Sequence, residues 1–283
     1  MFTSRHPCIF LPRLLMLEEQ VIVCFSHCGN HSNRLIQNLH FEAFCYDNNI
    51  QFLNPTFSSM RRLYNDPVQT RFSHILDVVR TPIRLLQKAG LAQYVITFNE
   101  DDHTEPSVLS GLKGISLVDG WGFRVYEATK KHYHVFRRKY SLRNHYLRNN
   151  RLLNLILDFK KRGTVVVGIH VRRGDYAIFQ NGDYFYSDDL YNRIIANARV
   201  AIGSHLHQEI VFVIFSNERT DFKHCITSRN KWYIDHHLMS QCDYLIGPPS
   251  TFTMWASYMG RVPYLHVFRD ANVDIGQFRI CYG

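Results

Sequence analysis

The stretch TVVVGIHVRRGDY, residues 164–176, joins an apolar, largely β-branched run to a cluster of charged side chains. Such a run is typical of a strand buried on both faces of a parallel sheet. In an extended segment Arg172 and Arg173 point to opposite faces, so one can reach a ligand while the other pairs with an acid such as Asp175. Because arginine is always charged and its fork of donors matches phosphate oxygens, the pair is a candidate diphosphate clamp. The Arg-Gly-Asp tripeptide directly follows the buried strand, which argues against an exposed adhesion loop.

Strand and helix patterns alternate along the rest of the chain. Apolar runs predict strands at 21–25, 50–54, 94–98, 115–118, 164–171, 210–215, 243–247 and 262–267. Helical spacing begins at Asn33 with Ser32 as candidate N-cap, and recurs at 60–92 (broken at Pro67 and Pro82), 124–160, 188–202 and 251–258. This alternation predicts an α/β fold with parallel sheets and right-handed crossovers. We expect two α/β lobes, residues 1–160 and 161–283.

Polar clusters follow three of the predicted strands where each strand ends. They are His170 to Asp175, then Ser216-Asn217-Glu218, then Pro248-Pro249-Ser250-Thr251. In open α/β sheets, ligands bind outside the carboxyl ends of the strands. The last cluster also opens a helix, where free backbone N–H groups and the helix dipole favour a phosphate. The sequence therefore predicts an anion site, with a purely structural ion-pair network and helix cap as the alternative.

The positive charge of the chain is concentrated in one segment. The formal net charge is +9, but residues 124–162 hold 12 Lys or Arg against only Glu127 and Asp158. This segment interleaves aromatic and basic residues, which would suit a nucleic-acid surface or an anionic membrane. We favour a solvated helix face beside a site for a charged nucleotide. Peripheral membrane contact through 124–162 is the second interpretation, and no nucleic acid is expected.

The seven cysteines are odd in number and scattered, so a reducing compartment fits better than a disulfide framework. Cys24, His27, Cys28 and His31 could bind zinc. However, Cys24 lies in a predicted strand and no second Cys/His knuckle accompanies the group, so no metal is expected. The apolar segment 8–17 is interrupted by Pro12 and Arg13 and is too short to span a bilayer. We therefore expect a cytoplasmic protein, with peripheral membrane association as the alternative.

Three stretches resemble the α1,2-fucosyltransferase family, glycosyltransferase family 11, within the α1,2/α1,6/protein-O-fucosyltransferase group. They are GIHVRRGDY, the downstream SNE, and CDYLIGPPSTFTMWASYMGRVP. The turn and helix CGNHSNRLIQNLHFEAFCYDNN is similar to that family's N-terminal Gly-Asn motif, with Ser32-Asn33-Arg34 where Gly-Asn-Gln is common. Residues 60–160 carry little recognisable signal.

The resemblance implies a GT-B-like architecture, two Rossmann-like lobes with a donor cleft between them. Residues 1–160 would form the acceptor-side lobe, and residues 161–283 would bind GDP-fucose as donor. It also implies an inverting transfer of L-fucose to a glycan hydroxyl, the 2-hydroxyl of a galactoside, without a cofactor or an obligatory metal. The partners would be the nucleotide-sugar donor and the glycan acceptor.

The resemblance also assigns residues. Arg173 would contact the donor phosphates, and Arg172 would support the site or share that contact. Candidate catalytic residues are Arg173, Arg172 and Asp175; candidate donor-binding residues are His170, Asn33, Ser216, Asn217, Glu218, Ser250, Thr251 and Phe252. For the general base, Asp175, Asp183 and Glu218 are candidates in that order. A different donor or acceptor, a basic binding module and a donor-binding pseudoenzyme stay open as alternatives.

Overall fold

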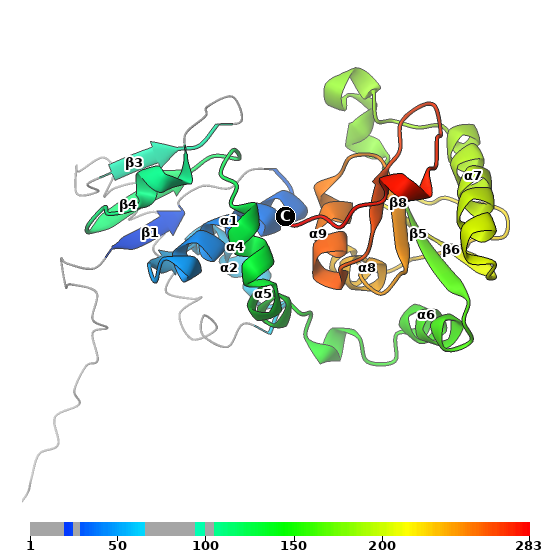
Figure 1. Cartoon of the computed structure of the whole chain (residues 1–283), viewed down its shortest axis with the longest axis horizontal. Helices are drawn as coiled ribbons and strands as arrows, with labels where there is room; N and C mark the ends of the chain where they lie inside the picture. Colours follow the sequence, from blue (N-terminus) through cyan, green and yellow to red (C-terminus); the bar gives the residue numbers. More distant parts are fainter. Residues whose placement is uncertain (1–19, 25–28, 66–93, 100–104) are drawn as a thin grey trace, which may run out of the picture.

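Two parallel sheets, one in each half of the chain, organise this computed structural model (Figure 1). The structure describes residues 20–24, 29–65, 94–99 and 105–283. The first sheet has the strand order β2-β1-β4-β3 and the second β7-β6-β5-β8-β9, and all pairings within them are parallel. The predicted α/β fold with parallel sheets is confirmed.

The first sheet is small and carries helices from the N-terminal half. Its strands are β1 Val21–Cys24, β2 Gln51–Leu53, β3 Tyr94–Thr97 and β4 Ile115–Asp119. The helices of this half are α1 His31–Asp47, α2 Ser58–Arg61, α4 Tyr126–Lys131 and α5 Tyr133–Lys139. The long α1 follows β1 directly, so its first turn lies at the carboxyl edge of this sheet.

The second sheet is built around β5, Val165–Val171, whose seven residues are all buried. Its neighbours are β6 Ile210–Ser216, β7 Ile226–Thr227, β8 Tyr244–Gly247 and β9 Tyr264–His266. Helices cover both faces of a central parallel strand, and this coverage explains why the sequence of β5 is apolar without alternation. In register with β6, the last residue Val171 lies opposite Ser216, so the polar segments that follow both strands leave the sheet side by side.

Four helices enclose this second sheet. They are α6 Arg151–Lys161, α7 Asp188–Leu206, α8 Trp232–Met239 and α9 Thr251–Gly260. One apolar cluster packs α7 against one face through Ile194 and Ile202, and another packs α6, α8 and α9 against the opposite face. The serines Ser187 and Ser250 cap α7 and α9 by accepting backbone N–H bonds.

The two halves share an apolar core. Leu35 of α1 and Phe136 of α5 belong to the same buried cluster as Trp255 and Tyr258 of α9. The Tyr258 hydroxyl donates to the carbonyl of Thr129 at 3.0 Å, across the same junction. The first turns of α1 and α9 meet between the two sheets through a hydrogen bond between Thr251 and Asn33 (Figure 1).

Most predicted elements match, and the differences have physical causes. Helix α1 begins at His31 rather than Asn33, and Ser32 bonds to another helix instead of capping its own. The predicted helical segment 124–160 is divided into α4, α5 and α6 by turns. Strand β7 was not predicted, because two residues are too few to show a period. Of the segment 60–92, residues 66–92 lie outside the described residues, as does the apolar stretch 8–17.

Within the described part of the chain, no helix is long and apolar enough to cross a membrane. Five cysteines fall in the described residues, and all five are free thiols: Cys24, Cys45, Cys225, Cys242 and Cys281.

Candidate functional site

The chain turns sharply where it leaves β5. Gly174 has φ +66°, in the left-handed region that favours glycine, and it opens the 3-10 helix η4, Gly174–Ala177. A Cβ atom there would lie 3.2 Å from the side-chain amide of Asn217 and 3.5 Å from Glu218. The segment after β5 therefore packs closely on the segment after β6, and glycine is the residue that permits it.

Arg173 is anchored inside the protein. The residue is 7% exposed, and its guanidinium donates to the carbonyl of Tyr186 and to the carboxylate of Asp188. Its backbone N–H donates to the Asn217 side chain at 2.8 Å. The guanidinium also stacks between the rings of Phe185 and Tyr191, at 5.4 and 5.3 Å. A phosphate that bound Arg173 would have to compete with these contacts. Because Arg173 is buried, the Arg-Gly-Asp tripeptide is not accessible to an adhesion receptor.

Arg172 lies on the other face of the strand and is more accessible. Its side chain is 21% exposed and forms an ion pair with Asp175 at 2.7 Å. This pair agrees with the prediction that one of the two arginines bonds to Asp175. The Arg172 guanidinium also lies 5.0 Å from the centre of the Tyr176 ring. A partly exposed guanidinium with a surface carboxylate as its ion-pair partner can exchange that partner for a ligand.

The first turns of α1 and α9 meet at two of the predicted donor-binding residues. The Thr251 hydroxyl donates to the side-chain oxygen of Asn33 at 2.5 Å. The Ser250 side chain caps α9 by accepting from the Phe252 N–H at 3.2 Å. Gly29 makes room for this arrangement, because a Cβ atom on it would lie 2.3 Å from the Asn33 side-chain nitrogen. The free N–H groups at the start of α9 thus lie at the junction of the two halves.

A stack of aromatic rings packs around the first turn of α9. His170 is buried, its Nδ1 lies 2.8 Å from the Thr253 hydroxyl, and its ring stacks on Phe252 at 5.0 Å. Phe252 in turn contacts the ring of His236 at 4.0 Å, and His236 Nε2 lies 3.1 Å from the Ser32 hydroxyl. Burial, with a smaller contribution from Arg172, lowers the pKa of His170 to about 3. His170 is therefore neutral near pH 7 and acts here as a packing and hydrogen-bonding support.

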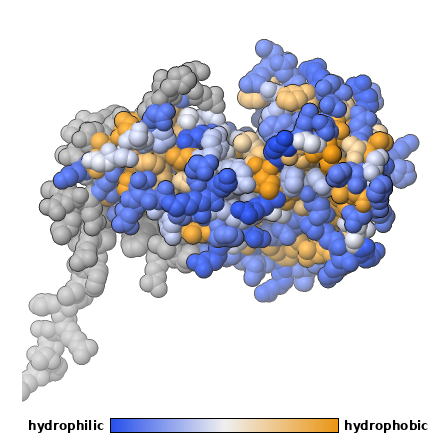
Figure 2. Space-filling view, in the orientation of Figure 1, coloured by the Kyte–Doolittle hydropathy of each residue, from blue (hydrophilic) through white to orange (hydrophobic). Residues whose placement is uncertain are grey.

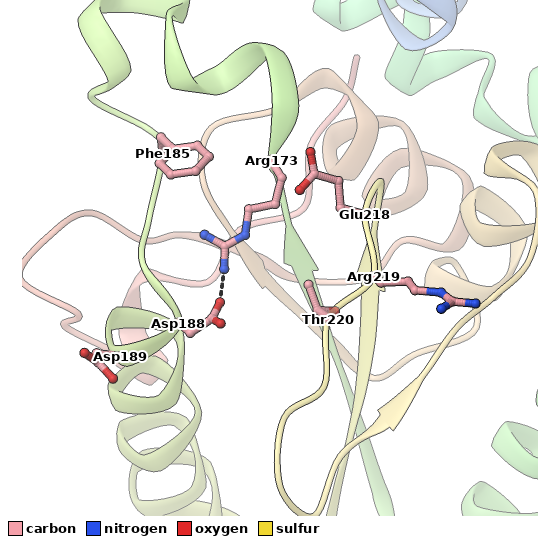
Figure 3. Close-up of a pocket in the computed structure, with 7 residues that line it drawn as sticks. All are labelled: Arg173, Phe185, Asp188, Asp189, Glu218, Arg219 and Thr220. Atoms are coloured by element: carbon pink, nitrogen blue, oxygen red, sulfur yellow. Dashed lines mark hydrogen bonds and ion pairs between the residues drawn. The ribbon is translucent and has the colours of Figure 1, made fainter.

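A pocket of about 410 Å³ opens at the carboxyl ends of β5 and β6 (Figure 3). Its lining is Arg173, Phe185, Asp188, Asp189, Glu218, Arg219 and Thr220. Three of these groups are carboxylates, and Phe185 supplies an aromatic wall. The Thr220 hydroxyl is buried and has no hydrogen-bond partner within the described part of the chain. Arg173, which is paired with Asp188, and Arg219 line the same pocket. The pocket therefore offers hydrogen-bond acceptors, an aromatic surface and a guanidinium, and the acceptors and the ring suit a planar group that carries N–H donors.

The predicted residues take different places around the site. Glu218 lines the pocket, whereas Asn217 holds the backbone of Arg173 and Ser216 accepts from the Glu218 N–H at 3.2 Å. Phe252 belongs to the ring stack. Sequence reasoning missed Phe185, Asp188, Asp189, Thr220 and His236. Only the two aspartates gave a signal, as acidic residues that open a predicted helix.

The described residues contain no group of three or more His, Cys, Asp or Glu side chains that could hold a metal ion. His27 and Cys28, two members of the zinc alternative, lie outside the described residues. Cys24, a third member, is buried in β1.

Comparisons with known proteins give the family and the fold of the chain. Residues 121–267, more than half of the chain, match the model of Glycosyl transferase family 11. No curated protein matches the sequence significantly. The structure is similar to a mutant of Arabidopsis thaliana FUT1 in complex with GDP, at 10% identity and a TM-score of 0.52, over 93% of this chain and 73% of that chain.

Two further likenesses are to the same fucosyltransferase. The NodZ α-1,6-fucosyltransferase co-crystallized with GDP has 13% identity and a TM-score of 0.51, over 88% of this chain and 94% of that chain. The selenomethionine form of NodZ from Bradyrhizobium gives the same values. At these identities the likeness shows the fold, and the expected GT-B-like architecture is confirmed.

Proposed function

The chain belongs to glycosyl transferase family 11, and we propose that it transfers L-fucose from GDP-fucose to a glycan hydroxyl with inversion. The 2-hydroxyl of a galactoside is the acceptor group we propose. The observation that supports the proposal most is the Thr251–Asn33 hydrogen bond, which joins the start of α9 to α1. Arg172 contacts the ring of Tyr176, whose hydroxyl donates to the carbonyl of Pro249 just before that helix start. The fucosyltransferases FUT1 and NodZ, which share the fold, were solved with GDP, which supports this donor.

We place the diphosphate between the start of α9 and Arg172. The N–H groups and dipole of a helix start favour phosphate, and the Arg172 guanidinium can exchange Asp175 for phosphate oxygens. Arg173 then supports the site by fixing the turn after β5, while Arg172 stabilises the negative charge that develops on the leaving GDP. One well-placed donor of this kind contributes roughly 2.7–4 kcal/mol to lowering the barrier.

We place the guanine base in the pocket of Figure 3, and we call this pocket the base pocket because it would hold the nucleobase. Guanine presents neighbouring N–H donors, N1–H and the amino group, on its pairing edge, and the carboxylate of Glu218 can accept both. Phe185 can stack on the ring. The carboxylates of the pocket would repel the diphosphate. We therefore place only the guanine in the pocket, and the diphosphate at the start of α9 and Arg172.

Inversion requires the acceptor hydroxyl to attack from the face opposite GDP, with a base to take its proton. Of the three predicted candidates, Asp175 and Asp183 are both exposed, whereas Glu218 lines the base pocket. We therefore propose that one of the two aspartates is the general base. With the charge on GDP stabilised by Arg172 and the start of α9, the reaction needs neither a metal ion nor a cofactor.

We assign the donor to residues 161–283 and the acceptor side to residues 1–160. The protein is proposed to be cytoplasmic, and peripheral contact with anionic membranes would use exposed basic residues of the segment 124–162, among them Lys130 and Arg138. Neutralising these residues should lower vesicle binding and leave the transfer to soluble acceptors unchanged.

An assay of GDP-fucose hydrolysis and of transfer to a panel of galactosides tests the proposal. We expect GDP release and a fucosylated galactoside, both strongly reduced in Arg172→Ala and retained in Arg193→Ala, which changes an exposed arginine on α7. GDP binding without transfer to any acceptor would identify a pseudoenzyme. Failure to bind GDP at all would overturn the assignment of the donor.

A further inference from the structure

A second, smaller cavity lies where α5 meets α8 and α9, apart from the base pocket. Its volume is about 150 Å³. Pockets for drug-sized ligands begin at about 300 Å³, so this one has room for a single small ring. Tyr64 and Tyr140 line it from the N-terminal half, and His236 and Trp255 from the C-terminal half. A ligand in it would therefore touch both halves of the protein.

Two polar atoms at this cavity are buried without a hydrogen-bond partner among the described residues. They are the hydroxyl of Tyr64, a residue 3% exposed, and Nδ1 of His236, a residue 4% exposed. Buried polar groups are nearly always bonded, so each such atom needs an explanation. Burial raises the pKa of Tyr64 and lowers the pKa of His236, so both side chains are neutral at pH 7. They can each offer one hydrogen bond to a neutral ligand.

The remaining lining is aromatic and polar rather than charged. Tyr140 lies edge-on to Trp255 at 5.4 Å and to Tyr64 at 5.9 Å, so these rings form a continuous aromatic wall. Ser240 and Gln241 add hydrogen-bonding groups. Among the described residues that line the cavity, Arg137 is the only Lys, Arg, Asp or Glu. Aromatic faces that contact C–H groups, together with scattered neutral hydrogen-bonding groups, suit a pyranose ring.

The cavity is connected to the proposed donor site through one side chain. The ring of His236 contacts Phe252, the second residue of α9, and its Nε2 bonds to Ser32 in the first turn of α1. The start of α9 is also where we place the diphosphate, with Arg172 on its other side. The atom that His236 leaves unbonded, Nδ1, is then available to a group in the cavity.

We propose that this cavity is a subsite for one neutral pyranose ring of the acceptor glycan, bound by the Tyr64 hydroxyl, His236 Nδ1 and the Tyr140–Trp255 wall. The assignment of the ring to the acceptor rests on the proposed transferase function. Binding of a neutral sugar at the cavity does not depend on it, so the two can be tested separately.

The first test uses Tyr64→Phe, which removes only the unbonded hydroxyl. Because that hydroxyl has no partner within the described structure, its loss should leave the melting temperature unchanged or slightly raised. We expect the KM for lactose to rise by about threefold to tenfold, the effect of one neutral hydrogen bond. The affinity for GDP, measured by calorimetry, should stay constant. The matched control is Tyr126→Phe, the same change at an exposed tyrosine outside the cavity.

The second test needs no turnover. Saturation-transfer NMR of the full chain with the methyl glycosides of β-galactose, β-glucose, β-xylose and β-N-acetylglucosamine should show contact with at least one of them, weakened in Tyr64→Phe and not in Tyr126→Phe. If no glycoside binds, or if Tyr64→Phe matches wild type in both tests, the subsite is wrong. If a glycoside binds but GDP does not, the sugar site stands and the proposed transferase function fails.

Discussion

The side-chain oxygen of Asn33 accepts a hydrogen bond from the Thr251 hydroxyl at 2.5 Å, and this bond joins the first turn of α1 to the first turn of α9. The two residues lie 218 positions apart in the sequence. The bond joins a helix of the N-terminal half to a helix of the C-terminal half, at the helix start where we propose that the diphosphate binds. Donor binding and the relative position of the two halves are therefore coupled through one hydroxyl.

Replacement of Thr251 by valine removes that hydroxyl and keeps the shape of the side chain. We expect GDP to bind about threefold to tenfold more weakly, because the substitution removes the hydrogen bond to Asn33 that holds the start of α9, and one neutral hydrogen bond contributes about 0.5–1.5 kcal/mol. Calorimetric titration with GDP measures this, with Thr227→Val on β7 as the control. In the double variant with Asn33→Ala, the two losses should be less than additive, and full additivity would contradict the coupling.

Alanine substitutions of the two arginines after β5 should have different effects, one on turnover and the other on stability. Arg172→Ala should fold normally and lose turnover by about 10²–10³-fold, the effect of removing one charge-stabilising donor. Arg173→Ala should lower the free energy of unfolding by about 1–3 kcal/mol, because it removes the buried bonds to Tyr186 and Asp188. Thermal denaturation and initial rates distinguish them, with Arg193→Ala as the control. An Arg173→Ala protein with normal stability and no turnover would instead show that Arg173 binds the phosphate.

The base pocket predicts discrimination by the amino group of guanine. Wild-type protein should prefer GDP over inosine diphosphate, which lacks that group. Glu218→Gln should reduce this preference by about tenfold or more, since a carboxylate acceptor is replaced by a neutral amide. Competition titrations with both nucleotides measure it. Asp221→Asn, an exposed neighbouring carboxylate outside the pocket, should behave as wild type. Equal binding of both nucleotides to the wild type would place the base elsewhere.

A buried carboxyl predicts how stability depends on pH. Burial raises the pKa of Asp235 to about 7, while the hydrogen bond from Ser228 acts in the opposite direction. The folded state therefore holds this proton more tightly than the unfolded state, so stability falls as the pH rises from about 4 through 7. Asp235→Asn should flatten that fall between about pH 4 and 7 in thermal denaturation. Asp158→Asn, an exposed change, should keep the wild-type slope.

Metal removal gives a fifth prediction. Because the proposed charge stabilisation comes from Arg172 and the start of α9, treatment with EDTA should leave both transfer and hydrolysis of GDP-fucose unchanged. A loss of activity that Mg²⁺ or Mn²⁺ restores would show that a cation shares this role.

The sequence predicted what local chemistry determines. The buried strand β5 was recognisable because both of its faces are covered, and the pairing of an arginine with Asp175 follows from the short spacing along the chain. The partner of Arg173 was not predictable, since Asp188 reaches it only after the chain has turned through η4 and the following loop. Asn33 and Thr251 were both named as donor-binding residues, but their mutual bond depends on how the two halves pack.

The second cavity had no sequence signal at all. Its lining comes from residue 64, α5, α8 and α9, and a tyrosine or tryptophan in these elements looks like ordinary core until the helices are assembled. Strand β7 was not predicted either, because its two residues form a strand only through their pairing with β6.

The shared core between α1, α5 and α9 has a consequence for the stability of the whole molecule. Trp255 and Tyr258 are buried by side chains from the other half of the chain, so separating the halves would expose two large aromatic residues to water. Neither half can then melt while the other stays native, and the protein should denature in a single cooperative transition. Residues 161–283 produced alone would carry this aromatic surface uncovered, and they would aggregate instead of forming an independent nucleotide-binding domain.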